Sequence, residues 1–127
     1  MARKHQETLH QYKERIIDPI SKSYCAAKWY NATIWLGHGQ TTSCHHPPGH
    51  WIPLEELESN PSAIHNTPHK KKMRKMMQEG ERPSECEYCW KVEDMGKNNI
   101  SDRVFKTEIF SDKDIQTTVD MPWEENV

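Results

Sequence analysis

Four cysteines constrain this chain more than any other feature: Cys25, Cys44, Cys86 and Cys89. Cys86 and Cys89 form a C-x-x-C pair, and eighteen residues separate Cys25 from Cys44. Four thiolates that converge on one point can hold a structural zinc ion or an iron–sulfur cluster. The sequence therefore predicts a fold that brings two distant segments and the C-x-x-C pair together around one metal centre.

The composition explains why such a centre would matter. Only 19 of the 127 residues are Leu, Ile, Val or Phe, which is below the roughly one-fifth at which disorder becomes a concern. The net charge is only −2, however, and disordered chains usually carry a large one. We therefore expect a small, loop-rich α+β domain: a β-hairpin and two or three short helices, held together by tryptophans and one metal centre.

The sequence also indicates where the chain works. It has no apolar run long enough to span a bilayer, and its start lacks the apolar core of a signal peptide. We expect a cytoplasmic protein with no membrane segment. Because the cytoplasm keeps thiols reduced, the four cysteines fit metal ligands better than two disulfides.

The first third of the chain predicts a helix and then a β-hairpin. Residues 4–17 are polar with a narrow apolar stripe, and Asp18-Pro19 should end this lead-in helix. Residues 30–36 are rich in aromatic and β-branched side chains, and the glycines at 37 and 39 predict a turn before a second strand. Cys25 would lie near the entrance of the hairpin and Cys44 at its exit.

The middle of the chain predicts a loop and a capped helix. Residues 45–62 contain four prolines and should form a loop with one helical turn at 54–57. Thr67 and the proline after it are typical of a helix start, and Gly80 is placed to end that helix. Its basic run, residues 69–75, should be a solvated face, whereas its methionines should pack in the core.

Two further elements are predicted after Gly80. Ser84 and Glu87 have the spacing of a capping box, so Cys86 would lie in the first turn of a helix and Cys89 one turn later. Residues 103–110 resemble a strand. We expect Trp29, Trp35 and Trp90 to shield the metal centre from water.

Spacing alone leaves zinc and cluster open. Zinc ribbons usually bring two C-x-x-C pairs, and this chain has one. A mixed Cys/His zinc site is a further alternative, because five histidines lie near Cys44 in the sequence: His38, His45, His46, His50 and His65. We expect these histidines to be solvated. Nucleic-acid binding by the basic run is the weakest alternative, because acidic residues follow it closely.

The order of the motifs resembles a known family. The pattern Cys25-x13-Gly39-x4-Cys44, then Asn66-Thr-Pro before a basic helix, then Gly80-x-x-Pro-x-x-Cys86-x-x-Cys89 is similar to the SPASM domain and its shortened form, Twitch. These are auxiliary iron–sulfur domains of radical S-adenosylmethionine enzymes. The resemblance covers about residues 24–102, and it is nearest to phage or marine bacterial proteins, which would place a phage-encoded copy in the host cytoplasm.

This resemblance implies one [4Fe–4S] cluster bound by Cys25, Cys44, Cys86 and Cys89. The longer SPASM pattern continues with more cysteines, which are not found here, so a single cluster is implied. The chain also lacks the C-x3-C-x2-C loop that cleaves S-adenosylmethionine and shows no other catalytic motif. We therefore expect an accessory part that works with a radical S-adenosylmethionine catalytic domain or chain, on a peptide or protein substrate.

The same resemblance suggests how the chain is divided. Residues 1–22 would form the lead-in helix and residues 23–110 the cluster-binding domain. Residues 111–127 are interpreted as a linker toward a missing or separate catalytic barrel. The competing hypothesis is a non-catalytic interaction module stabilised by Zn²⁺ on the same four cysteines.

Overall fold

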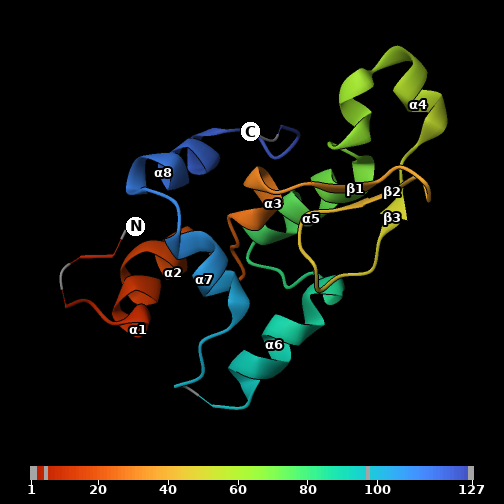
Figure 1. Cartoon of the computed structure of the whole chain (residues 1–127). Helices are drawn as coiled ribbons and strands as arrows, with labels where there is room; N and C mark the ends of the chain where they lie inside the picture. Colours follow the sequence, from red (N-terminus) through yellow and green to blue (C-terminus); the bar gives the residue numbers. More distant parts are fainter. Residues whose placement is uncertain (1–2, 5, 97, 126–127) are drawn as a thin grey trace.

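The computed structural model describes residues 3–4, 6–96 and 98–125 and shows a small α+β domain (Figure 1). The predicted fold class is confirmed, with more helix than expected. The elements are α1 (Leu9–Tyr12), η1 (Lys13–Ile17), α2 (Asp18–Ile20), α3 (Ala27–Tyr30), β1 (Thr33–Trp35), β2 (Gln40–Thr42), β3 (His50–Trp51), α4 (Leu54–Ser59), η2 (Pro61–Ile64), α5 (Pro68–Gln78), η3 (Ser84–Cys86), α6 (Glu87–Asp94), α7 (Asp102–Glu108) and α8 (Asp112–Asp120). Among the described residues, no helix has both the length and the apolar character needed to cross a membrane.

The lead-in helix starts later and ends later than predicted. The Thr8 hydroxyl accepts a hydrogen bond from the backbone N–H of Gln11, and the Gln11 side chain accepts one from the backbone N–H of Thr8. From this capping box the helix continues through η1 and α2 to Ile20, so Asp18-Pro19 does not end it. The π-helical turn η1 just before Pro19 interrupts the regular hydrogen-bond ladder, and this accommodates a residue without an N–H.

The predicted β-hairpin is present and gains a third strand. β1 pairs with β2, with Trp35 opposite Gln40, and Gly39 takes a φ of 66° in the turn between them. β3 pairs with the other edge of β2 and places Trp51 opposite Gln40 as well. Side chains directly opposite one another share a face of the sheet, and here Trp35 and Trp51 are 41% and 72% exposed. The expectation that Trp35 shields the metal centre is therefore wrong.

Helix α5 has both of its predicted ends. The Thr67 hydroxyl accepts a hydrogen bond from the backbone N–H of Lys70, and Gly80 follows the helix with a φ of 79°. Met73 and Met77 are buried, as their shared face predicts. Caps and a left-handed glycine act on neighbouring residues only, so this helix could be located from the sequence.

The basic run of α5 is solvated only in part, which corrects the sequence interpretation: Lys72 and Lys75 are exposed, but two other basic residues are not. Lys70 and Arg74 are almost fully buried. Nζ of Lys70 donates to Oγ1 of Thr41 at 2.9 Å, while Arg74 donates to Oδ1 of Asn66 and to the carbonyl of Trp123. Buried cations are tolerated because hydrogen bonds replace their lost hydration. These bonds tie α5 to the sheet and to the C-terminal segment.

The predicted strand at residues 103–110 is wrong, because most of this segment is helix α7. Its buried residues are Arg103, Val104, Thr107 and Glu108, a spacing of one, three and one that matches one side of a helix and not alternate faces of a strand. A short apolar run in a sequence is compatible with either a helix or a strand. Packing on α3 decides the outcome here, since Oγ1 of Thr107 accepts a hydrogen bond from the backbone N–H of Ala26 at 3.1 Å.

The hydrophobic core lies between the N-terminal helix, α3, α7 and α8 (Figure 1). Tyr24, Trp29 and Val104 are each at most 1% exposed. The segment interpreted as a linker contains α8, whose Ile115 belongs to this core. Oη of Tyr24 lies 2.6 Å from Oγ1 of Thr118, also on α8. The core therefore fixes the position of residues 23–27, which include Cys25.

Candidate metal centre

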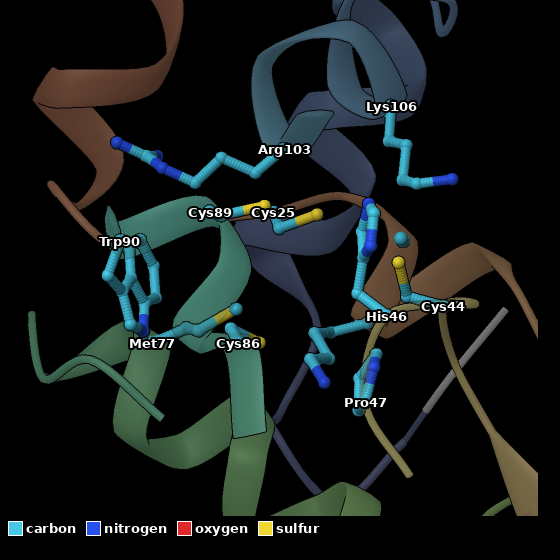
Figure 2. A pocket seen from close by; sticks show the side chains of 12 residues that line it. Cys25, Cys44, His46, Pro47, Met77, Cys86, Cys89, Trp90, Arg103 and Lys106 are labelled. Carbon is cyan, nitrogen blue, oxygen red and sulfur yellow. The ribbon is translucent and has the colours of Figure 1, made fainter. Parts of the chain in front are cut away.

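All four cysteines line one cavity (Figure 2). Cys25 lies just before α3, Cys44 follows β2, Cys86 ends η3, and Cys89 lies in the first turn of α6. The core fixes α3, the hairpin turn fixes the end of β2, and Pro83 and the following 3₁₀ turn lead into α6. The structure thus brings together the complete set of site residues that the sequence predicts.

The walls of the cavity exclude water on most sides. Apolar walls come from Ala27, Pro47, Met77 and Trp90. The cavity holds about 360 Å³ not filled by protein atoms, solvent at its opening included. Such shielding protects metal–thiolate bonds from hydrolysis and lowers the local dielectric constant.

Trp90 is held in place as a wall, as predicted. Its Nε1 donates to the carbonyl of Pro83 at 2.7 Å. The guanidinium of Arg103 lies 5.5 Å from its ring centroid, and that of Arg82 lies 5.0 Å from it. Both distances are within the range of cation–π attraction. The ring is therefore held by one hydrogen bond and by two neighbouring cations.

The four cysteine sulfurs are not gathered as tightly as the ligands of a bound zinc ion. In a tetrahedral zinc site with Zn–S bonds of about 2.3 Å, every pair of sulfurs is about 3.8 Å apart. In the described part of the chain, the group of three or more Cys, His, Asp or Glu ligand atoms found within 4.8 Å of one another consists of Cys44, His45 and His46. No three of the four cysteine sulfurs meet that limit. A polynuclear cluster holds its thiolates farther apart, because its own metal and sulfide atoms stand between them.

Burial favours the protonated form of three thiols, those of Cys25, Cys86 and Cys89. Desolvation raises the pKa of Cys25 to about 12, and it also raises the pKa of Cys86 and of Cys89. Two backbone hydrogen bonds to sulfur act in the opposite direction and lower the pKa. The backbone of Ala27 bonds to the sulfur of Cys25, and the backbone of Arg103 bonds to the sulfur of Cys89. Such donors stabilise thiolates and tune the potential of clusters. Metal binding must therefore release protons from this site.

Cations surround the cavity, and the sequence analysis missed them. Nζ of Lys28 lies 2.6 Å from Oε2 of Glu85, and Nε of Arg103 lies 2.6 Å from Oε2 of Glu93. Lys106 also lines the cavity. A site with four thiolates keeps a net negative charge whether it holds Zn²⁺ or a [4Fe–4S] core with its sulfides, so nearby cations stabilise the loaded site. The position of Lys28, three residues after Cys25, was the one local signal; nothing near Arg103 or Lys106 in sequence pointed to this site.

The predicted capping box before α6 does not form. Ser84 starts the 3₁₀ turn η3, α6 begins at Glu87, and no side-chain cap bond is present at either helix. Cys86 itself takes the N-cap position of α6, with φ −92° and ψ 24°. The backbone N–H of Cys86 bonds to the carbonyl of Pro83 at 3.1 Å. The rigid proline and this turn, in place of the Ser84 side chain, set the direction of the C-x-x-C pair.

The histidines near Cys44 in sequence separate in space. His45 and His46 stay beside Cys44, and His46 also lines the cysteine cavity. His50 instead faces α5, with its Nε2 2.6 Å from Oγ1 of Thr67. His38 is exposed in the hairpin turn. The expectation that all of these histidines are solvated is thus corrected for His46 and His50.

Comparisons with protein-family models, with curated proteins and with solved structures gave no match. The site is therefore argued from its own geometry. That residues 24–102 belong with the SPASM and Twitch domains stays a prediction from the order of the motifs.

Proposed function

We propose that this chain binds one [4Fe–4S] cluster through Cys25, Cys44, Cys86 and Cys89. The observation that carries the proposal is that these four cysteines line one shielded cavity. Their sulfurs are also spaced more widely than the ligands of a bound zinc ion. The donor set also fits, since four thiolates are the usual ligands of such clusters. Backbone donors to sulfur and the nearby cations fit a bound cluster in the same way.

A cluster held by four thiolates supplies one-electron transfer or structural support. With a thiolate on every iron, no iron is left open to bind a substrate. The chain's own residues then act on the electrostatics of the site: Lys28 places a positive charge next to the Cys86 sulfur, and Trp90 keeps water away. Both effects influence the reduction potential of an iron–sulfur site.

The partner in this proposal is a radical S-adenosylmethionine catalytic domain or chain. The resemblance supports it, as does the presence of local features that the motif order implies: Gly39 with positive φ before Cys44, and a helix that starts after Thr67 and stops at Gly80. The substrate class, a peptide or protein, and the cytoplasmic location belong to the same proposal. A reading frame with a C-x3-C-x2-C loop next to this one would identify the partner.

Elemental analysis tests the cluster. The chain is purified without oxygen, and iron, acid-labile sulfide and zinc are measured together with the absorption spectrum. The proposal expects about four irons and four sulfides per chain and a broad brown absorption that bleaches on reduction. One zinc per chain without labile sulfide, also after anaerobic reconstitution with iron and sulfide, contradicts it and favours a protein that binds zinc.

Ligand variants test the assignment. Cys86→Ser and Cys89→Ser should each lose most of the iron, because serine is a poor ligand for iron–sulfur clusters. Ser84→Ala, at an exposed position two residues before Cys86 whose side chain makes no cap bond, is the matched control and should keep the wild-type iron content. Full iron content in both cysteine variants would show that the ligands have been wrongly assigned.

A further inference from the structure

A second group of metal-binding atoms lies at the edge of the cysteine cavity. One ligand atom each from Cys44, His45 and His46 lies within 4.8 Å of the other two. Tetrahedral zinc needs such atoms within about 4 Å of one another, with Zn–S bonds of about 2.3 Å and Zn–N bonds of about 2.0 Å. The distances between these three atoms exceed that geometry by less than about 1 Å. The four cysteine sulfurs, in contrast, would have to move farther to converge on a single ion.

His46 is oriented by its neighbours as a metal-bound histidine usually is. Its Nε2 lies 2.5 Å from Oδ2 of Asp102, and its ring stacks on Tyr88 with centroids 4.1 Å apart and planes at 13°. A carboxylate on one ring nitrogen fixes the tautomer and leaves the other nitrogen for a metal. Nδ1 is therefore the atom of His46 that is left to bind. Figure 2 shows the His46 ring on the same side of the cavity as Cys44.

His45 completes the group from the solvent side. Its ring centroid lies 3.9 Å from that of His46, and its side chain is exposed, whereas Cys44 is half-buried. An ion bound by these three residues could take water as its fourth ligand. One thiolate, two imidazoles and one water suit a borderline divalent ion such as Zn²⁺.

We propose that Cys44, His45 and His46 form a mononuclear site for Zn²⁺. This site shares Cys44 with the four-cysteine site, and its other two ligands are different. The two sites are mutually exclusive, because Cys44 cannot complete both ligand sets. A chain without a cluster takes up zinc here, and cluster assembly must displace it. This inference stands on the His-Cys geometry and does not require that the cluster assignment is right.

X-ray absorption at the zinc edge tests the proposal directly. The full, reduced, metal-free chain receives one equivalent of Zn²⁺. The proposal expects about one sulfur and two imidazole nitrogens around zinc, with one oxygen. Coordination by four sulfurs overturns it. This outcome is independent of the iron and sulfide content after cluster reconstitution, so failure of one proposal is distinguishable from failure of the other.

Variants identify the ligands by competition with a chromophoric zinc chelator. His45→Ala combined with His46→Ala should weaken zinc binding at least about tenfold, and Asp102→Asn should weaken it by about ten- to a hundredfold through the orientation of His46. His38→Ala, an exposed histidine in the hairpin turn, is the matched control and should bind zinc as the wild type does. Wild-type affinity in the double histidine variant overturns the proposal.

A chain with Cys25→Ser and Cys86→Ser separates the two sites. It should lose the cluster but keep the zinc affinity of the wild type, with circular dichroism as the check on folding. Loss of zinc binding in a folded double cysteine variant would assign zinc to the four-cysteine site and overturn the proposal. Should this variant fail to fold, the zinc-edge measurement on the wild type decides.

Discussion

The ammonium group of Lys28 lies 2.6 Å from Oε2 of Glu85 and also hydrogen-bonds to the sulfur of Cys86. Lys28 is only 3% exposed. Burial opposes its charge, but Cys86 and Glu85 outweigh that effect and raise the pKa of Lys28. Burial likewise opposes the charge of Glu85, yet hydrogen bonds from His69 and Lys28 lower the pKa of Glu85 to about 2. A charged pair is thus fixed directly beside a proposed cluster ligand.

Lys28→Met should destabilise the chain and impair cluster binding. It leaves Glu85 buried without Lys28, and removing one partner of a buried ion pair costs about 3–5 kcal/mol. Urea unfolding measures the stability, and iron analysis measures the loading. Lys91→Met is the matched control, because Lys91 pairs with Glu87 at the surface, where both side chains are mostly exposed. Loss of this exposed pair should change the free energy of unfolding by no more than about 0.5 kcal/mol. Equal effects of the two substitutions would show that the Lys28 pair is not buried as described.

Removing both charges should recover part of this loss. In Lys28→Met combined with Glu85→Gln, no buried carboxylate is left without its lysine, so the unfolding free energy should exceed that of Lys28→Met alone. The iron content should stay below that of the wild type, because the cation beside Cys86 is still missing. A double variant less stable than either single variant would contradict this account.

His50 should make the chain sensitive to mild acid. Burial, together with the nearby charge of His69, lowers the pKa of His50 from 6.5 to about 4. The folded state therefore disfavours the protonated ring, so the contribution of His50 to stability is complete above about pH 6.5 and is lost as the pH falls toward 4. The contribution of Glu85 to stability is lost at lower pH, as the pH falls below about 4.5 toward 2, because the pKa of Glu85 falls from 4.5 to about 2 on folding.

His50→Gln isolates this effect. Between about pH 6.5 and pH 4.5, the wild type should lose on the order of 2 kcal/mol more unfolding free energy than the variant does. The difference between the two proteins removes the contribution of acid-induced metal loss, which both share. Parallel pH profiles for wild type and variant would show that His50 does not titrate in this window.

Arg74 should be one of the most sensitive positions in the chain. It donates to Oδ1 of Asn66, to the carbonyl of Lys28 at 3.3 Å and to the carbonyl of Trp123 at 2.8 Å. Arg74→Met removes these donors and leaves buried acceptors unpaired, which should cost about 3 kcal/mol in urea unfolding. Lys72→Met, on the exposed side of the same helix, should stay within about 0.5 kcal/mol of the wild type. A small effect at Arg74 would mean that other donors or water satisfy these acceptors.

The two glycines of the hairpin turn should respond differently to alanine. Gly39 has a φ of 66°, whereas Gly37 has no positive φ, and an added Cβ meets no atom within 4 Å at either position. Gly39→Ala should therefore cost about 1 kcal/mol from backbone strain alone. Gly37→Ala should be neutral or slightly stabilising, because it restricts the unfolded chain. Thermal unfolding of both variants, measured side by side, checks this; equal costs would contradict the turn geometry.

The elements that could be predicted from the sequence are those with local causes. Thr67 and Gly80 bound α5, and the left-handed Gly39 closes the hairpin, because caps and turns depend on residues within a few positions. The four cysteines could be grouped because their number matches one complete ligand set. These signals were enough to locate the candidate site in the chain and to place its ligands at the end of a strand and the start of a helix.

Tertiary contacts decided the rest. The sequence did not determine whether residues 102–108 form a helix or a strand, since packing against α3 settles it. Nor could it show that Lys28 and Arg74 are buried, because a buried cation needs acceptors from distant segments, which only the folded chain brings together. The distances between the cysteine sulfurs are likewise set by the packing of α3, β2 and α6. Ligand identity is thus local information, and ligand spacing is a property of the fold.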